Sequence, residues 1–338
     1  MDILIIKLGA IGDVIRTTCI LQGLREKYRN CKIHWVTGKA SLDTILTNSQ
    51  IDLVSLIDKP ADKIKKSSYD LVISLDDETD ACRLATRVKS KKIIGAYIED
   101  GKQAYTDDSS LWFDMGLISR LGKEKADFLK RKNKLTYQEI MYKILRLNYK
   151  KQLPSLHLVK KNLDFAKKFS DSKNISRKHP VIGINTGAGG RWEGKKLSEE
   201  KTAKLIDILK IKFPSSSIIL FGGPEEKQRN KKIIGLTRAK VIDAGCGNQL
   251  MDFAALVNLC DLIVTSDSLA LHIGVALGKK IVVFFGPTSS SEIELYSRGY
   301  KIIPKVGCLC CYKSKCDIPP DYNVDEIVSA VKRLVKGA

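Results

Sequence analysis

The sequence contains no long hydrophobic run. Although 43% of its 338 residues are hydrophobic and 28% are charged, no stretch approaches the roughly 18–20 consecutive apolar residues that a membrane-spanning helix requires. Residues 1–7 enter a predicted strand directly and lack the basic region and small-residue cleavage site of a signal peptide. We therefore expect a cytoplasmic protein, long enough for two domains of ordinary size.

Acidic residues are scarce relative to basic ones. The chain carries 58 Lys and Arg against 38 Asp and Glu, which gives a formal net charge of +20 at pH 7. Such an excess predicts an anionic partner: nucleic acid, an anionic membrane face or a phosphorylated glycolipid. No recognised nucleic-acid-binding module is present, and the basic residues lie among many acids, so we expect no nucleic-acid partner.

Two familiar nucleotide-binding motifs are also missing. Gly9 and Gly12, which follow the first predicted strand, have the spacing G-x-x-G and not the G-x-G-x-x-G of dinucleotide-binding proteins. The glycine-rich loop at residues 185–196 does not match the P-loop sequence G-x-x-x-x-G-K-[ST]. The sequence therefore points away from both of these classes of protein.

What the sequence does contain is a regular alternation of short apolar strands and amphipathic helices. Strands are predicted at residues 3–7, 33–37, 53–57, 71–75, 92–96, 180–184, 217–221, 241–243, 262–264 and 280–285. Helices are predicted between them, among others at 14–28, 59–66, 78–89, 198–212 and 249–259. This alternation predicts an α/β fold with two doubly wound, Rossmann-like parallel sheets. We assign 1–155 to a first domain, 156–179 to a linker, 180–322 to a second domain and 323–338 to a C-terminal helix.

The stretch at residues 262–286 organises the second half. It predicts a strand, a turn, a helix and another strand, with Asp267 and Ser268 at the turn and His272 in the first part of the helix. Free backbone N–H groups and the positive end of the helix dipole suit such a turn to a phosphate. The alternative is that Asp267 or Ser268 merely caps the helix and that His272 is a packed core residue.

A carboxylate stands at the corresponding place in the first half. Asp13 follows the first strand where a helix begins, so it can act as a general base at the carboxyl edge of the sheet. Arg16, one turn further on, can hold an anion or orient Asp13. The alternative is that Asp13 is an ordinary N-cap. Asp76 and Asp77, after the fourth strand, are interpreted as a solvated turn and not as a metal pair.

Two loops of the second half carry groups suited to a nucleotide diphosphate. The loop at residues 185–196 is rich in glycine, and its Lys195 and Lys196 can offset diphosphate charge. Glu225 and Glu226 follow a later strand, where a carboxylate either accepts ribose hydroxyls or forms an ordinary acidic first turn. In the first half, the basic run at residues 123–134 is either a solvated face or a contact for a phosphorylated acceptor or an anionic leaflet.

Five motifs, in order along the chain, resemble glycosyltransferase family 9, the ADP-heptose:lipopolysaccharide heptosyltransferases. They are KLGAIGDV at 7–14, NTGA at 185–188 with Lys195, FGGP-x-E at 221–226, SDS at 266–268 with His272, and FGPT at 285–288. The resemblance implies a GT-B fold with a cleft between its two domains. It also implies metal-independent, inverting transfer of a heptose from ADP-heptose to a hydroxyl of the lipopolysaccharide inner core. The partners would be an anionic glycolipid and the cytoplasmic face of the inner membrane.

The resemblance also implies roles for individual residues. Asp13 matches the catalytic base, Lys195 the lysine that neutralises the diphosphate, and Glu226 the carboxylate on the adenosine ribose. Donor or substrate contacts are expected from Gly12, Arg16, Thr186, Gly187, Lys196, Gly222, Gly223, Asp267, Ser268, His272 and Thr288. The lysine loop departs from the common Lys-Arg-Trp-Pro, so either Lys195 or Lys196 could serve. A protein hydroxyl as acceptor, or a nucleotide-sugar-binding scaffold without transfer activity, is the alternative function.

The nine cysteines do not form a secreted disulfide framework. Five are scattered among apolar neighbours and are expected to be reduced core thiols. The other four, Cys308, Cys310, Cys311 and Cys316, cluster near the C-terminus. They either ligate a structural zinc or iron or pack a loop as reduced thiols, and no cofactor is expected to be required for catalysis.

Overall fold

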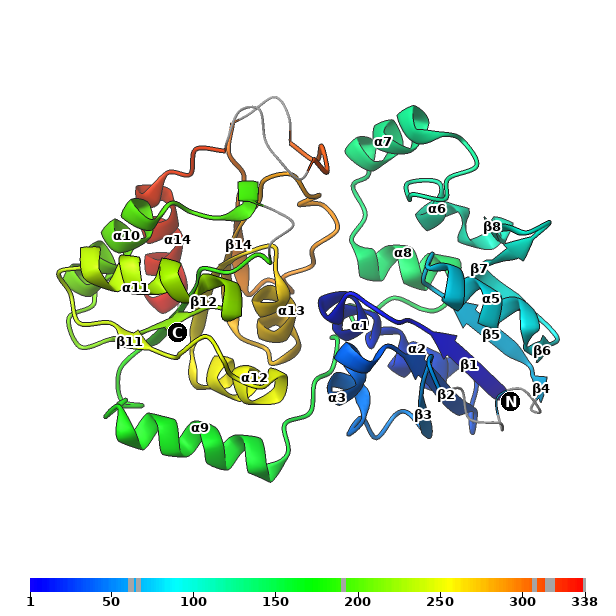
Figure 1. Ribbon diagram of the computed structural model, residues 1–338, viewed down its shortest axis with the longest axis horizontal. Coiled ribbons are helices and arrows are strands. Elements are labelled where there is room, and N and C mark those ends of the chain that lie inside the picture. The colour runs from blue at the N-terminus through cyan, green and yellow to red at the C-terminus, as the bar shows by residue number, and fades with distance from the viewer. Residues whose placement is uncertain (60–63, 65–67, 190–192, 306–308, 314–319, 337–338) are drawn as a thin grey trace. The chain divides into compact units, whose positions relative to one another are not determined.

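The computed structural model describes residues 1–338 except 60–63, 65–67, 190–192, 306–308, 314–319 and 337–338. Its contacts divide the chain into two compact units: Met1–His157 with Ser291–Glu294, and Leu158–Ser290 with Leu295–Ala338. Each unit is built on its own six-stranded sheet (Figure 1). In the part of the chain that is described, no helix is both long enough and apolar enough to cross a membrane.

The first unit is a doubly wound sheet with the strand order β3-β2-β1-β5-β7-β8. The strands are β1 (Asp2–Ile6), β2 (Lys32–Thr37), β3 (Leu53–Leu56), β5 (Leu71–Ser74), β7 (Ile93–Glu99) and β8 (Lys102–Tyr105). All pairs are parallel except β7 with β8, a hairpin that the sequence did not predict. The strand order reverses between β1 and β5, and a crevice opens at the carboxyl ends of strands at such a switch point.

The second unit repeats this plan with the order β11-β10-β9-β12-β13-β14. Its strands are β9 (Val181–Asn185), β10 (Ser217–Phe221), β11 (Ile242–Asp243), β12 (Leu262–Ser266), β13 (Lys280–Phe284) and β14 (Gly299–Ile302), and all are parallel. The five strands predicted for this half are confirmed, and β14 is an addition. Here the order reverses between β9 and β12, so the turn after β12 lies at a switch point.

Helices connect the strands in both units (Figure 1). The first unit holds α1 (Ile11–Thr17), α2 (Ile20–Lys27), α3 (Leu42–Ile45), α5 (Thr79–Arg87), α6 (Ser110–Phe113), α7 (Lys123–Lys132) and α8 (Tyr137–Ile144). The second holds α9 (Lys160–Ser172), α10 (Glu199–Lys212), α11 (Lys227–Leu236), α12 (Leu250–Leu259), α13 (Leu269–Ala276) and α14 (Val324–Lys336). Most of the helix predicted at 59–66 lies outside the described residues.

The single helix predicted at 14–28 is wrong, because α1 and α2 are separate. Thr18 lies at the break, where its hydroxyl donates to the carbonyl of Ile15 at 2.7 Å and accepts from the backbone N–H of Ser155 at 2.7 Å. A threonine that bonds to nearby backbone groups in this way competes with the regular helical pattern. Because of this break α1 is short. It follows the loop at the end of β1 directly in the sequence.

Candidate functional site

Asp13 lies in the first turn of α1, at the switch point of the first sheet. The N-cap of this helix is Ala10, and no side chain caps it, so the interpretation of Asp13 as an N-cap is wrong. Asp13 Oδ1 lies 2.9 Å from Arg16 Nε, and 34% of the Asp13 side chain is exposed. Gly12 is buried in the same turn. The carboxylate is therefore held by a cation and still accessible, as a general base must be.

Arg16 is fixed by two aromatic side chains. Its guanidinium carbon lies 3.9 Å from the ring centroid of Tyr137 and 5.7 Å from that of Trp112. Tyr137 is the first residue of α8, which begins with a capping box formed by Thr136 and Glu139. Burial is the main cause that raises the pKa of Tyr137, so its ring faces Arg16 as a neutral phenol. Stacking of this kind restricts the guanidinium to one plane.

Asp76 fastens the loop that leads to Asp13. Its Oδ2 accepts hydrogen bonds from Lys7 Nζ at 3.0 Å and from the backbone N–H of Leu8 at 2.9 Å, and the residue is only 5% exposed. The interpretation of Asp76 as part of a solvated turn is therefore wrong. Burial raises the pKa of the neighbouring Asp77, and the charge of Asp76 raises it further. Among the described residues, no group of three or more His, Cys, Asp or Glu could hold a metal ion.

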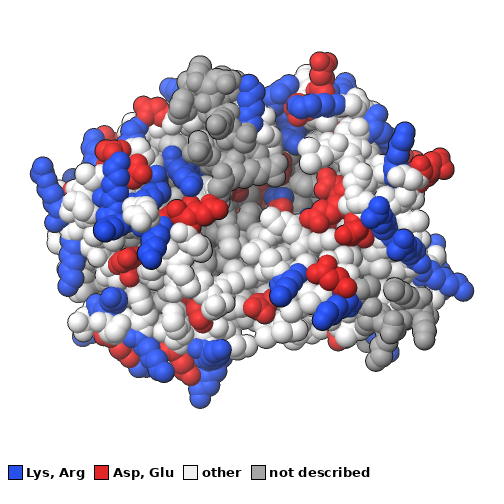
Figure 2. Space-filling view, viewed as in Figure 1, with Lys and Arg blue, Asp and Glu red and all other residues white. Residues whose placement is uncertain are grey.

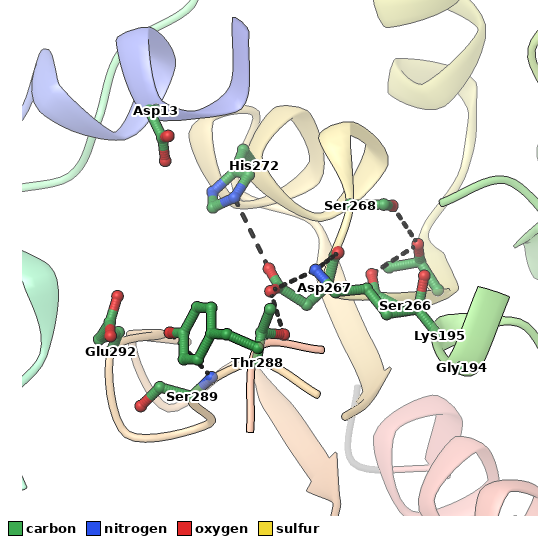
Figure 3. A network of polar contacts seen from close by, with 12 residues as sticks. Asp13, Gly194, Lys195, Ser266, Asp267, Ser268, His272, Thr288, Ser289 and Glu292 are labelled. Atoms are coloured by element: carbon green, nitrogen blue, oxygen red, sulfur yellow. Dashed lines mark hydrogen bonds and ion pairs between the residues drawn. The ribbon is translucent and has the colours of Figure 1, made fainter. Parts of the chain in front are cut away.

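In the second unit, the carboxylate of Asp267 is the centre of a polar network (Figure 3). Lys195 Nζ donates to the Asp267 carbonyl oxygen at 2.9 Å and to its Oδ2 at 3.0 Å. Thr288 Oγ1 donates to the same Oδ2 at 2.6 Å, and His272 Nε2 lies 3.8 Å from Oδ1. Burial would raise the pKa of Asp267, but Lys195, His272 and Thr288 together outweigh it and lower the pKa. Asp267 is thus an anion, and the groups that stabilise it lie at the edge of the candidate site.

The structure distinguishes the two lysines of the glycine-rich loop. Lys195 ends the short helix η3 (Glu193–Lys195), is 5% exposed and binds Asp267. The loop is held because Gly194 O accepts from Tyr322 Oη at 3.0 Å and lies where a Cβ at Gly286 would be only 2.6 Å away. Any side chain at position 286 would displace this carbonyl. Lys196 instead lies 3.1 Å from Glu226 Oε1.

Ser268 occupies the N-cap position of α13, but its hydroxyl does not cap the helix. It lies 2.9 Å from Thr265 Oγ1 and 3.2 Å from the side-chain nitrogen of Asn185, at the end of the neighbouring strand β9. The interpretation of Ser268 as a simple capping residue is therefore wrong. With the hydroxyl turned toward the sheet, the first turn of α13 keeps the character of an anion-binding helix terminus.

Glu226 lies close to several of the other residues that are predicted to contact the sugar donor. The short helix η4 (Pro224–Glu226) places its carboxylate so that Oε2 accepts from the N–H of Gly223 at 3.0 Å. A Cβ at Gly187 would lie 2.9 Å from this oxygen, so a side chain at this position would require the Glu226 carboxylate to shift. Thr186, buried at the end of β9, donates to Asn230 Oδ1 at 2.6 Å. A Cβ at Gly222 would lie 2.8 Å from the Glu226 Cβ.

The predicted site residues thus fall into three groups. Gly12, Asp13 and Arg16 lie together in the first unit, and two groups surround Asp267 and Glu226 in the second. The sequence did not single out Asp76, Tyr137, Asn185 or Glu292 as site residues. Tyr137 had a signal in the capping box Thr-x-x-Glu beside it, and Asn185 stands in the NTGA motif. Of the cysteine cluster, Cys310 and Cys311 are half-buried, whereas Cys308 and Cys316 lie outside the described residues.

Comparison with known proteins gives a consistent result. The family model described as glycosyltransferase family 9 (heptosyltransferase) matches residues 58–320. Lipooligosaccharide heptosyltransferase 2 of Campylobacter jejuni is 21% identical, with 96% of each chain covered. The family 9 glycosyltransferase from Veillonella parvula superposes with a TM-score of 0.79 at 18% identity, covering 100% of this chain and 97% of the other. The structure of the E. coli heptosyltransferase WaaC with ADP superposes with a TM-score of 0.64 at 15% identity, covering 99% of this chain and 100% of the other.

These structural likenesses establish the fold, and the family model accounts for most of the chain. Asp13 lies before the matched residues, but the relative from C. jejuni is aligned over nearly the full length. The two-sheet architecture agrees with this similarity.

Proposed function

The chain belongs to glycosyltransferase family 9, and from this premise we propose that it transfers a heptose from ADP-heptose to an acceptor hydroxyl in lipopolysaccharide inner-core assembly. The enzyme is a glycosyltransferase with a GT-B fold. The proposal covers the finer points: the ADP-heptose donor, inversion at the anomeric carbon without a catalytic metal, and the inner-core acceptor. The observation that carries it is the accessible Asp13 carboxylate, held by Arg16 at the switch point of the first sheet.

The proposed reaction is a single displacement. The acceptor oxygen forms a bond to C1 of the heptose, and the bond from C1 to the phosphate oxygen breaks, so the configuration at C1 inverts. Asp13 takes the proton of the acceptor hydroxyl. The electron pair leaves with ADP, whose developing charge is stabilised by Lys195 and by the N-terminus of α13. Protein-hydroxyl transfer, or nucleotide-sugar binding without transfer, is the alternative.

Donor recognition is tested through Glu226, whose carboxylate we propose binds the ribose hydroxyls. ADP and ADP-heptose are expected to raise the melting temperature of the protein by mass action, whereas UDP and GDP are not. Glu226→Gln is expected to weaken ADP binding by roughly ten- to a hundredfold, because a hydrogen bond to a charged group is lost. Isothermal titration calorimetry measures this affinity.

The matched control is Glu225→Gln, because Glu225 is the exposed neighbour of the buried Glu226. It is expected to bind ADP like the wild type. A preference for UDP or GDP would overturn the ADP assignment and leave the fold unaffected. Equal losses in both variants would remove Glu226 from the ribose site.

We further propose that the segment from Leu117 through α7 contacts an anionic membrane. Leu117 is 89% exposed, Leu121 45% and Phe128 41%, and Lys125 and Lys132 lie 5.4 and 4.6 Å from the Phe128 ring centroid. Apolar side chains flanked by lysines suit the boundary between acyl chains and anionic headgroups. Figure 2 shows basic side chains interspersed with acidic ones elsewhere on the visible face, so charge alone does not single out this segment.

Vesicle co-sedimentation tests the membrane contact. Leu117→Ser with Phe128→Ser is expected to lower partition onto phosphatidylglycerol-containing vesicles at least about tenfold, since each side chain contributes roughly 1.5–3 kcal/mol on burial. The control is Ile211→Ser in α10, another exposed apolar residue. Equal binding to purely zwitterionic vesicles, or an equal loss in the control, would contradict the proposal.

A structural zinc or iron at the cysteine cluster also remains a proposal, which elemental analysis of the purified protein tests.

A further inference from the structure

A short segment of the second half of the chain belongs to the first unit. Residues Ser291–Glu294 group with Met1–His157 by their contacts, although the residues on either side of them belong to the other unit. The backbone N–H of Tyr137 donates to the carbonyl of Glu292 at 2.9 Å, which ties the segment to the start of α8. Glu292 is only 7% exposed, so its carboxylate is buried.

That carboxylate lies beside the arginine that holds Asp13. Glu292 Oε2 lies 3.7 Å from Arg16 Nη1, while Arg16 Nε lies 2.9 Å from Asp13 Oδ1. One guanidinium is therefore shared between two carboxylates. Arg16 cannot lose its proton, and the Tyr137 ring restricts its movement, so it is a fixed charge between them.

We propose that Glu292 is a positioning residue that sets the proton affinity of Asp13 through Arg16. With Arg16 as its only charged neighbour, Asp13 would be stabilised as an anion and would be a weak base. A second carboxylate adds a negative charge near the shared guanidinium, which offsets part of its positive charge and favours protonation of Asp13. The inference rests on the proposed role of Asp13 as the general base.

Four other ionisable residues of the described first unit do not supply the same effect. Tyr137 on α8 and Cys19 at the start of α2 both have pKa values raised mainly by burial, so they stay neutral. Lys7 and Asp76, at the ends of β1 and β5, are paired with each other. Glu292 thus contributes a negative charge that contacts Arg16 from a separate segment of the first unit, Ser291–Glu294.

The test is the pH dependence of kcat/KM for Glu292→Gln, measured with ADP-heptose and heptose-free lipopolysaccharide core. Glutamine keeps the shape of the side chain and removes its charge. The acidic limb, where activity rises as the base loses its proton, is expected to move about one pH unit lower. The plateau is expected to fall roughly three- to tenfold because the base is weaker, while the ADP affinity stays unchanged.

Two comparisons make the outcome decisive. Glu294→Gln removes a carboxylate from the same segment and is expected to leave the acidic limb where it is. Glu292→Asp, which restores the charge, is expected to return the limb toward the wild-type pH. A uniform loss of rate with an unmoved limb would show a merely structural role and overturn the inference. If Asp13→Asn keeps its activity, the proposed base fails, whatever Glu292→Gln does.

Discussion

Asp13→Asn is expected to lower the rate of heptose transfer by at least about 10²–10⁴-fold, because asparagine cannot take the proton of the acceptor hydroxyl. Asparagine keeps the size of the side chain and an oxygen that can accept from Arg16, so α1 and its loop should be preserved. The initial rate of ADP release, measured with donor and acceptor together, gives the effect. The melting-temperature shift with ADP is expected to equal that of the wild type.

Asp43→Asn is the matched control, because Asp43 is an exposed acidic residue in the first turn of another helix of the same unit, α3. It is expected to transfer heptose at the wild-type rate. If Asp13→Asn retained more than a tenth of the activity, Asp13 would not be the base. If the wild-type protein bound ADP-heptose but transferred it to no hydroxyl, the scaffold alternative would be favoured.

Sequence reasoning predicted that the candidate residues follow the strand ends, because parallel strands put their polar residues at one edge. The strands β1, β9 and β12 are short apolar runs, and the segments directly after them carry Asp13, Thr186 and Asp267. In a doubly wound sheet these carboxyl ends border the switch point, so their side chains are available to a ligand. The local pattern was enough to predict both the sheets and these loops.

Residues whose position depends on contacts with distant parts of the sequence could not be predicted in this way. Asp76 looked like part of an exposed turn, yet it meets Lys7, 69 positions earlier in the chain, and is buried by that contact. Glu292 follows a run of serines with no local signal, and its place beside Arg16 depends on how the chain returns to the first unit. Hydrophobic periodicity reports burial along one element and cannot report such pairings.

The two adjacent lysines show the same limit at the donor site. Their sequence context left either one suitable for the diphosphate, and only tertiary structure separates the buried Lys195 from the more exposed Lys196. Lys195→Met is therefore expected to have two effects. It should destabilise the protein by about 3 kcal/mol, because Asp267 loses its buried cation, and it should lower kcat by roughly 10²–10³-fold, because charge on the leaving diphosphate is no longer offset.

A double variant separates these two effects. In Lys195→Met with Asp267→Asn, neither member of the ion pair is charged, so the free energy of unfolding measured in urea should recover most of the loss. The transfer rate should stay low, because the cation that offsets diphosphate charge is still absent. Lys196→Met, which leaves the Lys195–Asp267 pair intact, should be less destabilised and more active than Lys195→Met. Recovery of transfer in the double variant would mean that Lys195 only supports the fold, and the stabilisation of the leaving group would then have to come from the N-terminus of α13.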